Sequence, residues 1–280
     1  MTLSEVLLVT DCDGTLLQDD KSIAPEDQNA IERFRAAGGY FAVATGRSIP
    51  TGADLLRRLK PELPTILYNG SMLYDSEKGK ILWMTEIPSS ARFLVKEALS
   101  EFSGRLGAEV LIPEGMRVLA FNDLVDEHLN GAHPIAYEET TYEKVLPEHW
   151  LKVMFAMREE VQPEFLTFLE SFQAEGVRFV RSERYFFEIL PAKASKGNAL
   201  RRLCEEAGLS LERVVAIGDC DNDLELLEEA KVGIAVGNAF PSLKAKADLV
   251  TVSNKEHAVA WVIEELMKDP EGFFRQYGKK

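Results

Sequence analysis

Two aspartates one residue apart, Asp11 and Asp13, directly follow an apolar run of strand-forming residues and precede a glycine. In a parallel sheet that is buried on both faces, strands are near-continuous hydrophobic runs, and ligands bind beyond the carboxyl ends of the strands. The pattern therefore predicts that both carboxylates lie in such a crevice. A second set of closely spaced acids, which includes Asp219 and Asp223, follows another apolar run much later in the chain.

Each of these polar positions also has a purely structural explanation. An aspartate after a strand commonly caps the next helix, and a Thr-Gly pair such as Thr45-Gly46 is a common turn. A lysine that opens an exposed helix, as Lys196 would, is usually solvated. Taken singly, the structural explanation is favoured at every position. Taken together, two separate strands that end in crowded acids indicate a cation, because like charges cannot otherwise be packed side by side cheaply.

The predicted cation is Mg²⁺, which prefers one or two carboxylates together with waters and substrate phosphate oxygens. Asp11, Asp219 and a backbone carbonyl of the first loop suit that ion. A carboxylate can attack phosphorus to form an aspartyl phosphate if positive charge offsets the repulsion between it and the phosphoryl dianion. We therefore expect Asp11 to be the nucleophile and Asp13 to be the general acid and base. Thr45 would bind a phosphoryl oxygen, and Lys196 would offset charge on the nucleophile and the transferred group.

The elements that must position these residues alternate between apolar strands and amphipathic helices. This order predicts right-handed crossovers and an α/β fold with a doubly wound, Rossmann-like parallel sheet. A hairpin within residues 71–84 is expected at the edge of that sheet, and residues 278–280 are expected to be a frayed tail. The expected strands are the run up to residue 10 and residues 40–44, 65–68, 214–217, 233–236 and 249–252, and the expected helices are 22–37, 54–59, 196–207, 223–230, 241–247 and 256–267.

Residues 86–190 have a different character and predict an inserted α+β domain. The flanking residues 1–85 and 191–280 would together form one core domain. Residues 130–149 allow no assignment of structure. Elsewhere in the insertion, the expected helices are 91–102, 123–129 and 163–175, and the expected strands are 108–112, 116–121, 151–157, 177–181 and 185–190.

Composition narrows the class of protein. The 280 residues are 46% hydrophobic, and the longest apolar runs are strand-sized, so no membrane-spanning helix is expected. The chain starts without the features of a signal peptide, and its three cysteines are too few for a disulfide framework, which predicts a cytoplasmic protein. A net charge of -14 repels nucleic acid and acidic membranes. The expected partner is a small phosphorylated metabolite, with no nucleic acid or membrane, and the chain is expected to be a monomer or a homodimer.

Four motifs, taken in order, resemble those of the haloacid dehalogenase (HAD) superfamily of phosphotransferases. Within that superfamily the chain is similar to the Cof-type sugar phosphatases, which carry a large C2-type cap. The likeness covers the whole chain, including Asn69-Gly70 and Val236-Gly237-Asn238-Ala239. The motifs are Asp11-Cys12-Asp13-Gly14-Thr15-Leu16-Leu17, Ala44-Thr45-Gly46-Arg47, Ser195-Lys196-Gly197-Asn198-Ala199-Leu200 and Gly218-Asp219-Cys220-Asp221-Asn222-Asp223.

The resemblance implies a role for each matching residue. Asp11 would be the nucleophile and a Mg²⁺ ligand, Asp13 would be the acid/base and give its carbonyl to the metal, and Asp219 would be the third protein ligand. The inserted domain would be the cap that closes over the site and selects the substrate. The residues implied to bind the phosphoryl group or the rest of the substrate are Thr45, Gly46, Arg47, Asn69, Lys196 and Asn222, and Asp223 would support them by orienting Lys196 or a metal-bound water.

Two cysteines depart from the pattern of the family. Cys220 stands where the family often has glycine or serine, and Cys12 stands where it usually has an apolar residue. We expect both to be inert packing residues rather than redox groups, because a thiol beside carboxylates resists ionisation.

The expected function is that of a Mg²⁺-dependent phosphatase that hydrolyses a small phosphomonoester. Two alternatives stay open at this point. One is a phosphotransferase of the same superfamily, similar to phosphomannomutase, which passes the phosphoryl group to a second sugar hydroxyl instead of water. The other is a non-catalytic sugar-phosphate sensor, against which the presence of all the required acids argues.

Overall fold

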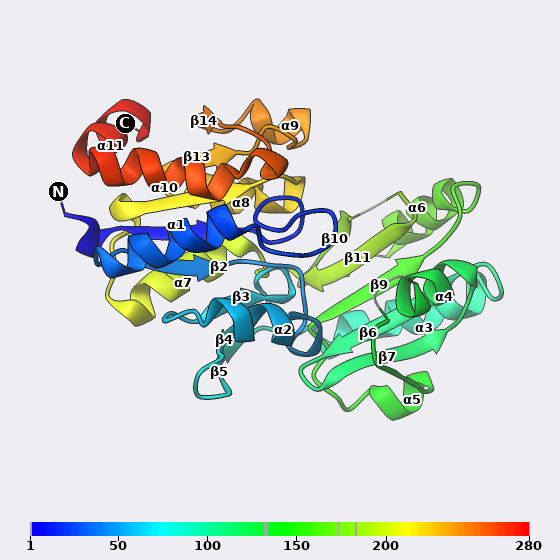
Figure 1. The fold of residues 1–280 in the computed structure, drawn as a ribbon. Coiled ribbons are helices and arrows are strands. Elements are labelled where there is room, and N and C mark those ends of the chain that lie inside the picture. Colours follow the sequence, from blue (N-terminus) through cyan, green and yellow to red (C-terminus); the bar gives the residue numbers. More distant parts are fainter. Residues whose placement is uncertain (1, 132–133, 173, 183, 280) are drawn as a thin grey trace. The chain divides into compact units, whose positions relative to one another are not determined.

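The computed structural model describes residues 2–131, 134–172, 174–182 and 184–279 (Figure 1). The chain divides into two compact units, and each is described by itself. The core unit comprises Met1–Gly46, Asp54–Trp83 and Ser195–Lys280. The insert unit comprises Arg47–Ala53 and Met84–Ala194.

A parallel sheet forms the centre of the core unit, with its strands in the order β14-β13-β12-β1-β2. All four residues of β1 are buried, which explains why the strand is an unbroken apolar run ended by a threonine. This sheet confirms the predicted doubly wound α/β fold. The strands are β1 (Leu7–Thr10), β2 (Tyr40–Val43), β12 (Val214–Gly218), β13 (Val232–Ala235) and β14 (Leu249–Val250).

Helices of the core unit cover this sheet, and α1 packs beside α10 while α7 packs beside α8 (Figure 1). Helix α1 begins with a proline in its first turn and buries its apolar stripe of Ala30, Ile31 and Phe34, as its spacing predicts. The helices are α1 (Pro25–Ala36), α7 (Lys196–Ala207), α8 (Leu224–Glu229), α9 (Pro241–Lys244), α10 (Ala258–Lys268) and α11 (Pro270–Tyr277).

The register of the central strands brings three strand ends to one edge of the sheet. Thr10 of β1 lies opposite Ile217 of β12 on one side and opposite Val43 of β2 on the other. Because these strands are parallel, the residues that follow them emerge together. The backbone N–H of Asp11 continues the pairing by donating to the carbonyl of Ile217 at 2.9 Å.

The third predicted strand does not join the parallel sheet as a regular member. Strand β3 (Thr65–Leu67) pairs antiparallel with β4 (Met72–Asp75), which neighbours β5 (Lys80–Met84) in a separate sheet. The predicted hairpin is therefore present, but in its own sheet rather than at the edge of the core sheet. A sharp reversal after β3 allows the antiparallel pairing, because Tyr68 and Asn69 have φ of 51° and 55° and Gly70 has φ of 92°, and β3 keeps an isolated parallel bridge from Ile66 to Ala44.

Two other predictions for the core unit are wrong. Helix α2 (Ile49–Leu59) begins five residues before the predicted start at residue 54, because Ser48 supplies a hydroxyl that accepts the backbone N–H of Thr51 at 3.3 Å. Residues 278 and 279 of the expected tail are not frayed, and residue 280 lies outside the described residues. Lys279 Nζ donates to the carbonyls of Glu228 and Ala230 at 3.1 and 2.8 Å, where α8 leaves its last carbonyls unpaired.

Helix α11 was also not predicted, although Asp269 caps it and Pro270 opens it.

The insert unit has a mixed sheet with strands in the order β10-β11-β9-β6-β7-β8. Its own apolar core gathers Phe102, Trp150, Phe155 and Phe165. Helix α6 ends at Ser171 rather than at residue 175. The strands are β6 (Gly107–Ile112), β7 (Gly115–Ala120), β8 (Tyr137–Glu139), β9 (Lys152–Ala156), β10 (Val177–Arg181) and β11 (Phe186–Pro191), and the helices are α3 (Ser89–Glu101), α4 (Asp123–Asn130), α5 (Tyr142–Val145) and α6 (Gln162–Ser171).

The unassigned residues 130–149 contain two short elements, β8 and α5. Strand β8 pairs parallel with β7, and its residues Glu138 and Glu139 are exposed. An exposed strand of three residues carries no apolar alternation, which is why its sequence gives no signal. None of the described helices is both long and apolar enough to cross a membrane.

Gly70 is the position where the fold of the core unit constrains the start of α7 most tightly. A Cβ on Gly70 would lie 2.1 Å from the backbone carbonyl oxygen of Ser195, the residue before Lys196. The backbone φ of 92° adds a second obstacle to any side chain. Gly208, at the other end of α7, has a φ of 66° but open space around it.

We predict that Gly70→Ala destabilises the protein far more than Gly208→Ala. In Gly208→Ala, the left-handed backbone alone should lower the free energy of unfolding by about 1–2 kcal/mol. In Gly70→Ala, the new side chain must also displace the backbone at Ser195, so the loss should exceed about 3 kcal/mol. The free energies of unfolding in urea measure the difference. Equal losses in the two variants would contradict the close approach of Gly70 to α7.

Candidate active site

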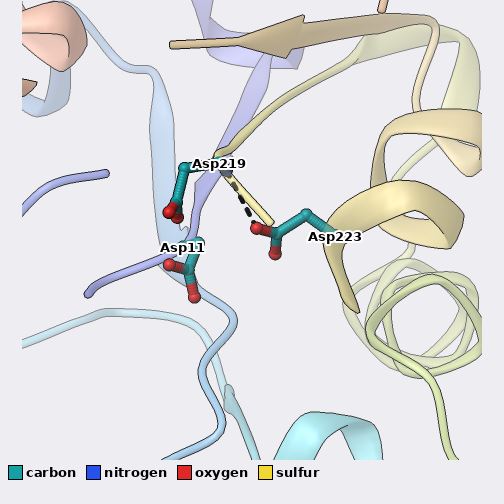
Figure 2. A group of neighbouring side chains, drawn as sticks. All are labelled: Asp11, Asp219 and Asp223. Atoms are coloured by element: carbon teal, nitrogen blue, oxygen red, sulfur yellow. Dashed lines mark hydrogen bonds between the residues drawn. The ribbon is translucent and has the colours of Figure 1, made fainter. Parts of the chain in front are cut away.

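Two carboxylates from adjacent parallel strands meet at the edge of the core sheet. Asp11 follows β1 and Asp219 follows β12, and both side chains are buried. Figure 2 shows them close together, with Asp223 beside them on the turn that follows Asp219. Oxygens of these three carboxylates lie within 4.8 Å of one another. The structure thus brings together the two sets of acids that the sequence separates by more than two hundred residues.

Lys196 supplies positive charge to this group from the first turn of α7. Its Nζ lies 2.6 Å from Oδ1 of Asp11 and 2.6 Å from Oδ1 of Asp223, and the side chain is only 1% exposed. The hydroxyl of Ser195 caps the helix by accepting the backbone N–H of Asn198 at 3.1 Å, which fixes where α7 begins. Lys196 is therefore a buried bridge between Asp11 and Asp223.

Asp223 orients both Lys196 and the backbone of the adjacent turn. While Oδ1 binds Lys196, Oδ2 accepts the backbone N–H groups of Asp219 and Cys220 at 3.0 and 3.1 Å. Of the two supporting roles that the resemblance allowed for Asp223, the contacts of both oxygens favour the orientation of Lys196.

Burial and crowding change the protonation equilibria of the site. Burial raises the pKa of Asp11 well above its ordinary value, and the repulsion by Asp223 and Asp219 adds to this, although Lys196 opposes it. Burial and Asp223 likewise raise the pKa of Asp219. Burial alone would lower the pKa of Lys196, but the attraction of Asp11 and Asp223 outweighs it and raises the pKa above the ordinary value. Lys196 is thus held as an ammonium, and the carboxyl groups of Asp11, Asp219 and Asp223 outnumber this positive charge.

Thr15, to which the sequence analysis gave no role, and Cys220, which it expected to be an inert packing residue, both contact Asp219. The hydroxyl of Thr15, which is buried, donates to Oδ1 of Asp219 at 2.8 Å. The thiol of Cys220 donates to Oδ2 at 3.1 Å. Burial, followed by the Asp219 charge, raises the pKa of this thiol, so Cys220 stays protonated as the neighbouring acids predict. For Thr15, the available signal was its place two residues after Asp13 in the first motif.

Thr45 lies close to three other predicted site residues of the core unit, which are Gly46, Asn69 and Asn222. Thr45 follows β2 by two residues and is buried, and its carbonyl accepts the backbone N–H of Asn69 at 3.1 Å. The Asn69 Oδ1 accepts a hydrogen bond from Asn222 Nδ2 at 3.1 Å. A Cβ on Gly46 would lie 2.7 Å from that same oxygen. The structure therefore brings Gly46, Asn69 and Asn222 together.

For two other predicted site residues, Asp13 and Arg47, the structure shows the following contacts. The Asp13 side chain is 38% exposed, and its Oδ1 pairs with Lys21 Nζ at 2.8 Å. Arg47 belongs to the insert unit, where its guanidinium donates to the carbonyl of Thr51 at 3.4 Å.

The positions of the carboxylates and of Lys196 suit a reaction of a charged group that is bound at the carboxyl ends of β1 and β12. Asp11 is an acid that a lysine holds at one oxygen, and Asp219 is an acid whose position is fixed by Thr15 and Cys220. These oxygens are the hard ligands that Mg²⁺ prefers, and the excess of carboxylates over cations leaves room for its charge. The site could thus hold a divalent ion and an anionic substrate together.

The chain matches a protein-family model and several known proteins. A model of the haloacid dehalogenase-like hydrolases matches residues 8–263. The chain is 28% identical over 273 residues to 5-amino-6-(5-phospho-D-ribitylamino)uracil phosphatase YitU of Bacillus subtilis (strain 168), a match that covers 95% of this chain and 98% of the relative. It is 30% identical over 270 residues to the putative phosphatase YxeH of the same organism, covering 93% and 98% of the two chains.

A solved structure agrees with these sequence relatives. The crystal structure of TM0651 from Thermotoga maritima superimposes with a TM-score of 0.82 at 27% identity and covers 93% of this chain and 97% of that one. The four motifs, the fold and the relatives therefore agree. The chain belongs to the haloacid dehalogenase-like hydrolases, and within them it is a phosphoric monoester hydrolase of the Cof type.

Proposed function

We propose that this enzyme hydrolyses a small phosphomonoester with Mg²⁺ through an aspartyl phosphate on Asp11. The observation that carries the proposal is the buried contact of Lys196 with Asp11 and Asp223, beside Asp219. An ion pair that served only stability would not need another carboxylate next to it, because that carboxylate adds repulsion. A nucleophilic carboxylate, by contrast, needs positive charge at its side when it approaches a phosphoryl dianion.

In the first step, Asp11 would attack phosphorus. Lys196 holds Oδ1, so Oδ2 is the candidate attacking oxygen. A bond forms between this oxygen and phosphorus while the ester bond between phosphorus and the alcohol oxygen breaks. Asp13 would give a proton to the departing oxygen, so its exposed carboxylate must first leave the ion pair with Lys21 and take up that proton from solvent.

In the second step, water would release the phosphoryl group from Asp11. Asp13, now ionised, would take a proton from the water as the new bond to phosphorus forms. The bond between Asp11 and phosphorus breaks, which regenerates the carboxylate and yields inorganic phosphate. Lys196 would offset negative charge on the carboxylate and on the phosphoryl oxygens in both steps.

The proposed ligands of Mg²⁺ are the carboxylates of Asp11 and Asp219 and the backbone carbonyl of Asp13. The raised pKa values of the two acids support this set, because burial and mutual repulsion leave the site short of positive charge. When bound, Mg²⁺ supplies charge that offsets the repulsion between Asp11 and the phosphoryl group. We assign Asp223 a positioning role, because its oxygens already bind Lys196 and two backbone N–H groups.

The phosphoryl group would be bound by Thr45 together with Lys196. The other proposed substrate contacts come from two places: the group of Gly46, Asn69 and Asn222 in the core unit, and Arg47 in the short segment that opens the insert unit.

We further propose that residues 86–190 form a cap that selects the substrate, inserted in a catalytic core of residues 1–85 and 191–280. The metabolite named for the relative YitU supports a small phosphorylated metabolite as the substrate class. No nucleic acid or membrane partner is proposed, and the enzyme would act as a monomer or homodimer. Free thiols at all three cysteines, each of which the structure describes, support a cytoplasmic location.

Replacing the nucleophile tests the mechanism. Asp11→Asn should lower kcat at least ~10⁴-fold, because an amide cannot form the aspartyl phosphate. Circular dichroism should show that the variant remains folded. The measurement is release of inorganic phosphate from a broad panel of phosphomonoesters that includes p-nitrophenyl phosphate. Asp19→Asn is the matched control, since Asp19 is 77% exposed, and it should keep wild-type activity. Full activity of Asp11→Asn would overturn the mechanism.

Metal removal and pH test the proposed Mg²⁺ ligands. The pKa values of Asp11 and Asp219 are raised in the folded state, so the folded protein binds more protons than the unfolded chain. The stability of the metal-free protein should therefore fall as pH rises through the raised values. The rise in Tm produced by MgCl₂ should accordingly grow as the pH is raised from below the raised pKa values of Asp11 and Asp219 to above them.

Two variants give this measurement its controls. Asp219→Asn should lose most of the Mg²⁺-induced rise in Tm, whereas Asp221→Asn, an exposed neighbour in the same turn, should keep it. An equal rise in Tm for wild type and Asp219→Asn would rule out Asp219 as a ligand.

A further inference from the structure

The loop that follows Asp11 is tied to a distant segment of the core unit through the side chain of Asn238. The segment 236–240 follows β13, and it is anchored at its ends because Val236 donates its backbone N–H to the carbonyl of Gly218 and Phe240 donates to that of Asp219, at 3.1 and 2.8 Å. Between these anchors, Asn238 Nδ2 donates to the carbonyl of Gly14 at 2.8 Å. One short segment thus contacts both the Asp219 turn and the first loop.

Asn254 extends this contact to the far end of the same loop. Asn238 Oδ1 accepts the backbone N–H of Asn254 at 2.9 Å, so the two asparagines are directly joined. Asn254 is buried, and its Nδ2 donates to the carbonyl of Leu17 at 2.9 Å. Its own carbonyl accepts Gln18 Nε2 at 2.9 Å. The linked pair of asparagines therefore holds the loop at two carbonyls, those of Gly14 and Leu17.

The loop between these carbonyls touches the proposed chemistry directly. Gly14 has a φ of 82°, and a Cβ on it would lie 2.5 Å from Oδ2 of Asp219, so its backbone packs against that carboxylate. Asp13 immediately precedes Gly14, and Thr15, which donates to Asp219, immediately follows it. Residues 11–17 form neither a helix nor a regular strand, and the loop is held by the backbone N–H groups of Leu16 and Leu17, which donate to the carbonyl of Cys12 at 3.0 and 2.8 Å, together with the contacts of the two asparagines.

We propose that Asn238 and Asn254 are positioning residues, which hold residues 13–17 so that Asp13 and Asp219 keep their places relative to Asp11. The inference rests on the proposed function. The side chains of both asparagines hydrogen-bond to loop carbonyls or to the other asparagine, so they act through Gly14 and Leu17 rather than on the substrate. A displacement of the loop by about 1 Å would be enough to slow the reaction by up to ~10²-fold.

Three variants test this inference in the full chain. Asn238→Ala and Asn254→Ala remove the side-chain contacts. Asn238→Asp keeps nearly the same size and keeps an acceptor for the N–H of Asn254, but it replaces the donor to Gly14 with a carboxylate oxygen. Asn29→Ala, at an exposed position on α1, is the matched control.

We expect kcat for p-nitrophenyl phosphate to fall about tenfold in all three variants, with KM changed less than about twofold. Hydrogen exchange should become faster at the backbone N–H groups of residues 13–17 and stay unchanged in the rest of the core unit. Asn29→Ala should match the wild type in both measurements. A residue that only stabilised the fold would lower Tm and leave kcat at the wild-type value.

The outcomes separate this inference from the proposed function. A wild-type kcat in Asn238→Ala and Asn238→Asp would overturn the inference, as would faster exchange spread over the whole core unit. An inactive wild-type protein would instead contradict the proposed function. In that case, faster exchange confined to residues 13–17 would still support the asparagine contacts as the loop's restraint, and unchanged exchange would overturn them.

Discussion

The buried ammonium of Lys196 is the constraint on which the rest of the site depends. An unpaired ammonium with 1% exposure would cost several kcal/mol, so Asp11 and Asp223 must stand on either side of it. The backbone near Lys196 also helps to hold the lysine in this position. Ser195 caps the helix that carries the lysine, and Gly70 lacks a side chain where the chain passes the carbonyl of Ser195.

Asp223 extends this constraint to the other strand end. One of its oxygens binds Lys196, and the other holds the backbone N–H groups of Asp219 and Cys220. The lysine and the Asp219 turn are thus fixed by a single carboxylate. Asp219 itself is held by Thr15, whose loop begins at Asp11, so the contacts form a closed circuit from β1 through α7 to β12 and back. Because each member has partners on both sides, loss of one residue should disturb several others.

Sequence patterns predicted the core sheet, and they singled out Asp11, Lys196 and Asp219, which the structure brings together, because these features leave strong local signals. A buried parallel strand is an apolar run, and an aspartate at its end stands out against that run, as Asp11 and Asp219 do. The expectation that those two ends meet came from their crowded acids, which indicated one cation site, and the structure shows that β1 and β12 are adjacent. Contacts that involve ordinary residues were not predictable in the same way. Thr15 and Asn254 gain their importance only through partners distant in the sequence, Asp219 for the first and Leu17 for the second.

The errors have physical causes of the same kind. Strand β3 was assigned to the parallel sheet because its apolar run looks like the others, and the reversal at Tyr68 and Asn69 depends on left-handed backbone that non-glycine residues rarely adopt. The supposed frayed end is fixed by the side chain of Lys279, whose partners lie at the end of α8. Strand β8 is exposed, so it lacks the apolar alternation by which strands are recognised.

Chemical trapping can detect the phosphoryl group on Asp11, where the proposed mechanism puts it beside Lys196. An aspartyl phosphate is reduced by borohydride to homoserine, so the enzyme can be quenched with borohydride during turnover of a phosphomonoester and its peptides examined by mass spectrometry. We expect homoserine at position 11, formed only when substrate is present. Homoserine at Asp13 or Asp219, or steady turnover with none at position 11, would contradict the proposed mechanism.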